Sequence, residues 1–128
     1  MPSKILVLDD EEDILSVVKT ILTIFKYECY PIKEWEKLHV TVNDVRPDLI
    51  LMDVRLVGND GRTLCKLLKA DDSTSMIPII LFSSLKNVDT LCNDCNAIDY
   101  IRKPFEVKEF LHKIKSHIST PSPVLYTA

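Results

Sequence analysis

The chain has 128 residues, enough for one domain with a sizeable core and too few for two. Its 16 basic and 19 acidic residues give a formal net charge of −3, and no strongly basic stretch favours nucleic acid or an anionic membrane as a partner. No apolar run is long enough to cross a bilayer, and the N-terminus lacks the layout of a signal peptide. We therefore expect a cytoplasmic protein.

The cysteines are expected to be reduced in that compartment. Cys92 and Cys95 have the spacing of a metal-ligating pair, but a zinc site needs a second pair. Cys29 and Cys65 are too scattered along the sequence to supply one at motif spacing. We therefore interpret the pair as structurally incidental.

Short apolar runs predict the strands of a sheet. A continuous apolar run of this length is typical of a strand buried on both faces, as in a parallel sheet covered by helices. The second run contains Pro31, which places it at an edge or cuts it short. The expected strands are residues 4–8, 28–32, 48–53, 77–82 and 98–101.

Helices are expected between and after these strands, and their apolar residues recur at three and four positions. Residues 86–96 carry several asparagines and few large aliphatics, so we expect a short or mobile element there. The expected helices are residues 12–26, 34–45, 62–70, 86–96 and 106–118. Their inward residues would include Ile14, Val17, Val18, Ile21, Leu22 and Phe25, then Leu64, Leu67 and Leu68, then Val107, Phe110, Leu111, Ile114 and Ile118.

The alternation of strands with helices predicts an α/β protein with right-handed crossovers and helices on both faces of one parallel sheet. The domain covers residues 1–118. Residues 119–128 contain two prolines and no periodicity, which favours a flexible tail or the stub of a linker.

Polar residues stand where the predicted strands end. Asp9 and Asp10 follow the first strand, Asp53 closes the third, Ser83 follows the fourth and Lys103 follows the fifth. The carboxyl ends of parallel strands meet at one edge of the sheet, where open α/β folds bind their ligands. Three carboxylates, a hydroxyl and a lysine at one edge suit a divalent cation and a phosphoryl group.

These residues, in this order, resemble the receiver (CheY-like) domain of a two-component response regulator. Gly61, eight residues after Asp53, and Tyr100, three before Lys103, fit the same pattern. The resemblance covers about residues 4–118. It implies a doubly wound, flavodoxin-like sheet of five parallel strands in the order 2-1-3-4-5.

The resemblance also implies roles for the residues at the strand ends. Asp53 would be the phosphoacceptor, with Lys103 and Ser83 contacting the phosphoryl oxygens. Mg²⁺ would be held directly by Asp10 and Asp53. The remaining implied contributions are Asp9 through a water, the backbone carbonyl of Arg55 as a metal ligand, and Pro104 through a cis bond after Lys103.

A second group of residues would tune and transmit the signal. Ser83 would move toward the phosphoryl group, Tyr100 would fill the space, and the surface of residues 86–118 would change. Arg55 and Leu85, with Ser84 beside them, occupy positions expected to gate the hydrolytic water, so we hypothesise slow self-dephosphorylation. Val57 stands where the family commonly has proline, which would leave the loop after Asp53 less rigid.

The implied function is phosphorelay signal transduction. A histidine kinase or a histidine phosphotransfer protein would phosphorylate Asp53, and an unknown downstream protein would read the changed surface. No DNA-binding segment follows residue 118, so direct nucleic-acid binding by this chain is not expected. Family members often pair through the fourth helix, fifth strand and fifth helix, which allows a phosphorylation-linked homodimer.

Two other functions remain to be weighed. A phosphatase of the haloacid dehalogenase type also uses an aspartate nucleophile, Mg²⁺ and a lysine, but it wants a second acid two residues later. Arg55 occupies that position and argues against it. A pseudo-receiver that serves only as an interaction module usually lacks the acidic pair, the phosphoacceptor or the lysine. All are present here, so only a binding test can support that function.

Overall fold

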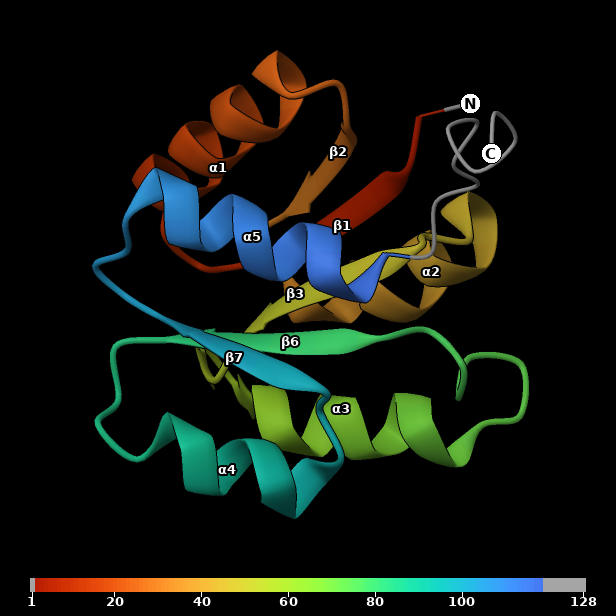
Figure 1. Cartoon of the computed structure of the whole chain (residues 1–128). Helices are drawn as coiled ribbons and strands as arrows, with labels where there is room; N and C mark the ends of the chain where they lie inside the picture. The colour runs from red at the N-terminus through yellow and green to blue at the C-terminus, as the bar shows by residue number, and fades with distance from the viewer. Residues whose placement is uncertain (1, 119–128) are drawn as a thin grey trace, which may run out of the picture.

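The computed structural model describes residues 2–118, so the predicted tail at 119–128 lies outside the described residues (Figure 1). Its centre is a sheet of five parallel strands in the order β2-β1-β3-β6-β7. Counted within this sheet, the order is 2-1-3-4-5, which confirms the expected topology. The strands are β1 (Lys4–Leu8), β2 (Glu28–Ile32), β3 (Leu49–Asp53), β6 (Ile79–Ser83) and β7 (Asp99–Arg102).

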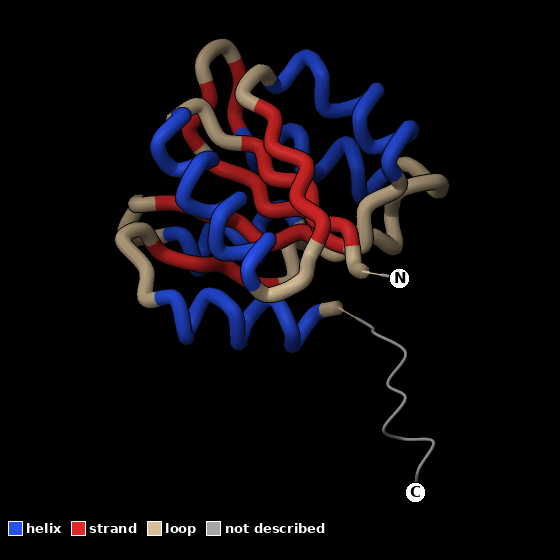
Figure 2. The backbone as a smooth tube through the Cα atoms, turned by 90° about the horizontal axis from the view of Figure 1, so that it is seen from above, coloured by secondary structure: helices blue, strands red, loops and turns tan. Residues whose placement is uncertain are grey.

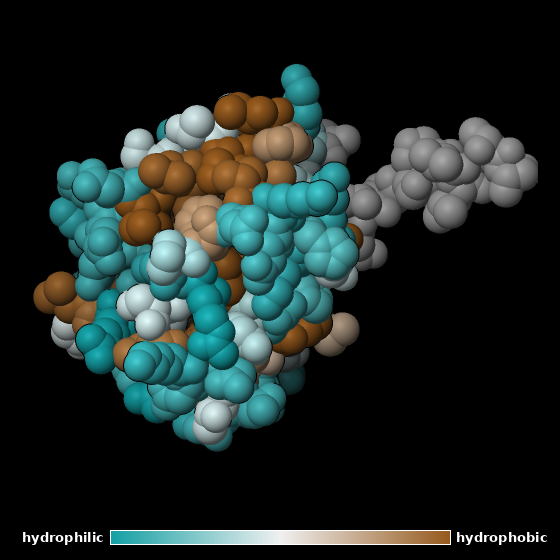
Figure 3. All heavy atoms as spheres, turned by 60° about the vertical axis from the view of Figure 1, so that its left-hand side comes forward, coloured by the Kyte–Doolittle hydropathy of each residue, from teal (hydrophilic) through white to brown (hydrophobic). Residues whose placement is uncertain are grey.

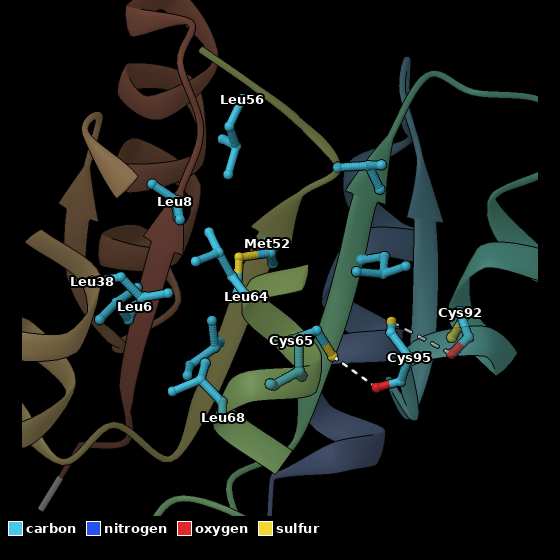
Figure 4. Packing of buried hydrophobic residues seen from close by; sticks show 14 of the residues in the cluster. Leu6, Leu8, Leu38, Met52, Leu56, Leu64, Cys65, Leu68, Cys92 and Cys95 are labelled. Atoms are coloured by element: carbon cyan, nitrogen blue, oxygen red, sulfur yellow. Dashed lines mark hydrogen bonds between the residues drawn. The ribbon is translucent and has the colours of Figure 1, made fainter. Parts of the chain in front are cut away.

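Helices cover both faces of this sheet (Figures 1 and 2). α1 (Glu12–Ile24) and α5 (Val107–His117) pack on one face, where Val18, Leu22 and Phe110 are buried against Ile5. α2 (Leu38–Val45), α3 (Gly61–Ala70) and α4 (Val88–Cys95) pack on the other. Figure 4 shows that second layer, in which Leu6 and Leu8 of β1 face the leucines of α2 and α3. The doubly wound arrangement predicted from the sequence is therefore confirmed.

Some residues expected to face inward are exposed. Val17 is 50% exposed, Phe25 46%, Leu67 63% and Val107 45%. A helix lying on a sheet buries only a stripe about two residues wide per turn, so apolar residues one step around the helix face solvent. In α1, Val18, Ile21 and Leu22 form the buried stripe, and the helix ends at Ile24, two residues before the predicted end.

The second helix begins with a 3₁₀ turn, η1 (Trp35–Lys37), before α2. α2 ends at Val45, and Arg46, which caps it, has a φ of 53° in the left-handed region. β2 keeps Pro31 within its length and lies at the edge of the sheet, as its missing backbone donor requires. α4 spans eight residues, so the predicted shortness of this element is confirmed.

The turn after Asp53 contains a small hairpin that the sequence predicted only as a turn. β4 (Arg55–Leu56) pairs antiparallel with β5 (Asn59–Asp60). Gly58 sits between them with a φ of +83°, and a Cβ placed on it would lie 3.3 Å from Nε1 of Trp35. Asp60 then begins α3, because its Oδ1 accepts a hydrogen bond from the Arg62 N–H at 2.8 Å.

Within residues 2–118, no helix has both the length and the apolar character needed to cross a bilayer.

Candidate functional site

The carboxyl ends of the strands surround a polar pocket of about 230 Å³. Its wall brings together most of the residues that the sequence placed at the strand ends. A larger hollow of about 380 Å³ lies between η1 and α3, but its lining is mainly apolar and holds none of the predicted site residues. We therefore take the polar pocket as the candidate site, lined by Asp10, Glu11, Asp53, Arg55, Ser83, Ser84 and Lys103.

Asp53 is the last residue of β3 and is 6% exposed. Burial raises the pKa of its carboxyl from the ordinary 3.8 to about 6, and the neighbouring Asp9 adds to the rise. Lys103 and the N–H of Arg55, which donates at 3.4 Å, act in the opposite direction. When the Asp53 carboxyl is ionised, its surroundings therefore compensate its negative charge only in part.

Lys103 joins the two buried carboxylates. Its Nζ lies 2.6 Å from Oδ2 of Asp9 and 3.5 Å from Oδ2 of Asp53. Asp9 is fully buried, and its Oδ1 also accepts a hydrogen bond from the N–H of Glu11 at 2.9 Å. The Lys103–Pro104 peptide bond is cis, as expected. Asp9, which the resemblance predicted to act on a metal through water, is therefore paired directly with Lys103.

Asp10 lies on the rim of the pocket and is turned toward the hairpin. Its Oδ2 accepts a hydrogen bond from the N–H of Val57 at 2.7 Å. Proline, which the family commonly has at this position, carries no N–H. Valine at position 57 therefore gives Asp10 a hydrogen-bond donor that proline would lack.

The donor set suits a magnesium ion. In the described part of the chain, no three His, Cys, Asp or Glu side chains are grouped to hold a metal ion. Mg²⁺ keeps several waters, however, and is usually bound through one or two carboxylates. Asp10 and Asp53 line one pocket with Arg55, and a cation there would offset the charge that burial of Asp53 leaves uncompensated. The residues present therefore fit such an ion.

Ser83 closes β6 and is 2% exposed. Its Oγ accepts a hydrogen bond from the N–H of Leu85 at 3.1 Å. A serine after a strand can also serve as a helix cap, but Ser83 does not cap α4, because Asn87 occupies the cap position. Ser84 lies in the pocket wall, whereas Leu85 packs against the core on the α4 side of the sheet.

Tyr100 lies on β7 and is not part of the pocket wall. Two cations flank its half-buried ring: Lys113 Nζ is 4.3 Å and Arg102 Cζ is 5.2 Å from the ring centroid. Neither partner of Tyr100 was predicted from the sequence. Arg102 is two residues from Tyr100 on the same strand, which was a usable signal, but Lys113 comes from α5 and gave none.

Gly61 sits where the start of α3 passes the end of β3. A Cβ on this residue would lie 2.0 Å from the backbone oxygen of Asp53, closer than any real contact. Its N–H donates to the carbonyl of Val54 at 2.8 Å. The absence of a side chain therefore lets the helix approach the backbone that carries Asp53.

Comparison with known proteins places this geometry in a family. The sequence model of the response regulator receiver domain matches residues 5–115. The phosphate regulon transcriptional regulatory protein PhoB of Pseudomonas aeruginosa is 34% identical over 121 residues, which are 93% of this chain and 53% of that protein. The chain thus spans about half the length of this curated relative.

Solved structures agree with the family match. The receiver domain of a signal transduction histidine kinase from Syntrophus aciditrophicus is 28% identical with a TM-score of 0.82, covering 89% of this chain and 88% of that one. A receiver domain of a sensor histidine kinase from Pseudomonas aeruginosa, solved with magnesium in its active site cleft, has a TM-score of 0.84 at 24% identity. It covers 94% of this chain and 100% of that chain, and shows the fold alone. The chain therefore belongs to the response regulator receiver domains, a family of two-component signalling domains rather than of enzymes.

Proposed function

We propose that this chain accepts a phosphoryl group on Asp53, with Mg²⁺ bound, from a histidine kinase or a histidine phosphotransfer protein. One observation carries the proposal: the buried Asp53 carboxylate opens into a polar pocket and lies 3.5 Å from the ammonium of Lys103. A nucleophile with a fixed cation beside it is what phosphoryl transfer needs, because the reaction depends on positioning and charge neutralisation. This role implies a cytoplasmic location, because the ATP from which a histidine kinase takes its phosphoryl group is found there.

The transfer uses the residues in stated roles. An oxygen of Asp53 forms a bond to phosphorus, the bond from phosphorus to the donor imidazole breaks, and that imidazole takes up a proton. Mg²⁺, when bound, supplies positive charge that offsets the carboxylates and the phosphoryl oxygens. Lys103 provides a point charge to one phosphoryl oxygen. The Oγ of Ser83 accepts from Leu85, which leaves its own proton free to donate to another oxygen.

The signal would leave the site along β6 and β7. Ser83 pairs in register with Arg102, and Leu81 with Tyr100. A shift of Ser83 would therefore be transmitted to the neighbouring strand. Movement of Tyr100 inward would break its contacts with Lys113 and Arg102 and change the surface that α4, β7 and α5 present. A downstream protein would read that surface. A homodimer through the same elements stays a prediction, which sedimentation with and without beryllofluoride would test.

The donor would approach over α1. This helix begins directly after Asp9 and Asp10, and its exposed apolar side chains gather on the face shown in Figure 3. Val17, Ile24 and Phe25 are 50%, 64% and 46% exposed. The helix thus offers exposed apolar surface along its length and starts next to the acidic residues, which suits a partner that docks a helical surface on α1 and delivers its histidine at the first turn.

The decisive experiment is the intact mass of the protein after incubation with acetyl phosphate and Mg²⁺. We expect a gain of one phosphoryl group, about 80 Da, that is absent in Asp53→Asn and prevented by a chelator. Where no mass is gained, binding of beryllofluoride is measured next, because a receiver that depends on its own kinase still binds this phosphoryl mimic. Failure of both would contradict the proposal and support a pseudo-receiver that only binds partners.

A further inference from the structure

Three of the four cysteines gather where α3 meets α4 (Figure 4). Cys65 on α3 and Cys95, the last residue of α4, are both fully buried. The Sγ of Cys65 donates to the carbonyl oxygen of Cys95 at 3.2 Å, so its side chain lies against the residue that carries the second thiol. Cys65 is separated from Cys95 by 30 positions, so no local motif predicts this pair.

Cys92, the apparent partner of Cys95 in sequence, is turned elsewhere. Its Sγ donates to the carbonyl oxygens of Ala97 and Asp99, both at 3.2 Å. The Sγ of Cys95 makes only a longer contact, 3.7 Å, to the carbonyl of Cys92. The cysteine that Cys65 contacts across the two helices is therefore Cys95 and not Cys92. A metal does not explain the cluster, because no metal-holding group of three such side chains occurs within residues 2–118.

The pair is chemically unequal. The neighbouring Cys65 side chain lowers the pKa of Cys95 more than burial raises it, and the N–H of Ala97 lowers it further, whereas the neighbouring Cys95 side chain and burial both raise the pKa of Cys65. The thiolate is the reactive form of cysteine, so Cys95 is the nucleophile of the pair.

We propose that Cys65 and Cys95 form a redox site that closes to a disulfide when a peroxide oxidises it, tying α3 to α4. Cys95 attacks the peroxide, the O–O bond breaks, and a sulfenic acid and one water form. The sulfur of Cys65 then attacks the sulfenic sulfur, forming the S–S bond and releasing a second water. Two thiols are oxidised and one hydrogen peroxide is reduced to two waters, so the step balances without a further reactant.

Access to the pair depends on α4. Both thiols are fully buried, so an oxidant reaches them only when α4 moves away from α3. α4 has eight residues and no side-chain cap at its start, which favours local opening. Because α4 would also belong to the signalling surface, a disulfide would hold it against α3 and oppose the switch. This last consequence rests on the proposed function, whereas formation of the disulfide does not.

The test is peptide mapping of the wild-type protein after treatment with hydrogen peroxide, without reduction. Trypsin separates the peptide of residues 63–66, which holds Cys65, from that of residues 87–102, and cleavage before Asp94 then separates Cys92 from Cys95. We expect the first peptide to be joined to the one that contains Cys95, with a loss of about 2 Da from the intact chain. Amide exchange over Val88–Cys95 should slow about tenfold.

Variants at the other cysteines provide matched controls. Cys29→Ser, on β2, and Cys92→Ser should leave the cross-link unchanged, whereas Cys65→Ser should abolish it. A bond between Cys92 and Cys95, or separate oxidation of single thiols without a cross-link, would overturn the proposal. The wild-type map alone decides this if Cys65→Ser fails to fold. Asp53→Asn should form the same disulfide, so failure of the phosphoryl-acceptor function and failure of the redox site remain distinguishable.

Discussion

The ammonium of Lys103 lies closer to Asp9, at 2.6 Å, than to Asp53, at 3.5 Å, and Asp9 is fully buried. The lysine that would neutralise a phosphoryl group on Asp53 therefore already holds a buried carboxylate in the unphosphorylated chain. Lys103 therefore contributes both to stability and to the proposed phosphorylation. Its removal would leave Asp9 as a buried, unpaired charge and Asp53 without its neighbouring cation.

Lys103→Met should lower both stability and phosphorylation. In chelator, we expect the free energy of unfolding to fall by about 3–5 kcal/mol, because Asp9 is left buried without its cation. Acetyl phosphate should label the variant at least tenfold more slowly, and added Mg²⁺ should recover part of the stability. Urea unfolding and intact mass measure the two effects. Lys33→Met is the control, since its pair with Glu12 is exposed and contributes little to stability.

Gly61→Ala should disturb the backbone that carries Asp53. The new Cβ would lie 2.0 Å from the carbonyl oxygen of Asp53, so the start of α3 or the end of β3 must move. We expect a loss of about 2–4 kcal/mol of stability and slower phosphorylation. Gly58→Ala is the matched control: its cost arises from a φ of +83° and should be about 1 kcal/mol. Equal losses in the two variants would show that the close approach at Gly61 is relieved elsewhere.

The pH dependence of stability should report on Asp53. Its pKa is raised from 3.8 to about 6, so between these values the folded state binds more protons than the unfolded state and stability falls as pH rises. Asp53→Asn does not titrate. In chelator it should match the wild type near pH 4 and exceed it by roughly 1–3 kcal/mol near pH 7. Thermal unfolding from pH 4 to 7 measures the difference, which Mg²⁺ should reduce at pH 7. A constant difference in stability between pH 4 and 7 would show that the pKa of Asp53 is not raised in the folded state.

Loss of the phosphoryl group should be slow in the wild type. Arg55 lines the pocket and its side chain is exposed, so it can cover the acyl phosphate from the solvent side. We expect Arg55→Asn combined with Leu85→Ala to lose the phosphoryl mass several-fold faster. Lys86→Asn, next to Leu85 and exposed, should decay at the wild-type rate. Because Leu85 packs against the core and does not line the pocket, Arg55→Asn alone should account for most of the change.

The sequence predicts the sheet and the strand-end residues well because both depend on local patterns. The apolar run before Asp53 is short and continuous, which admits few alternatives to a buried strand. The pairing of Lys103 with Asp9 spans 94 positions, and only the packed structure decides which carboxylate the lysine contacts. The hydrogen bond from the N–H of Val57 to Asp10 could not be predicted either, because the orientation of that N–H depends on the hairpin and on the backbone at Gly58. The contact of Lys113 with Tyr100 depends on how α5 docks, which no local pattern reveals.

The position of Trp35 next to the turn at Gly58 gives the chain a natural fluorescent reporter. Trp35 is its only tryptophan, and a side chain at Gly58 would begin 3.3 Å from the indole nitrogen. Val57, the residue before Gly58, is hydrogen-bonded to Asp10. A cation that draws Asp10 inward would therefore shift the hairpin against the indole, so events among the carboxylates should be visible in intrinsic fluorescence without an added dye.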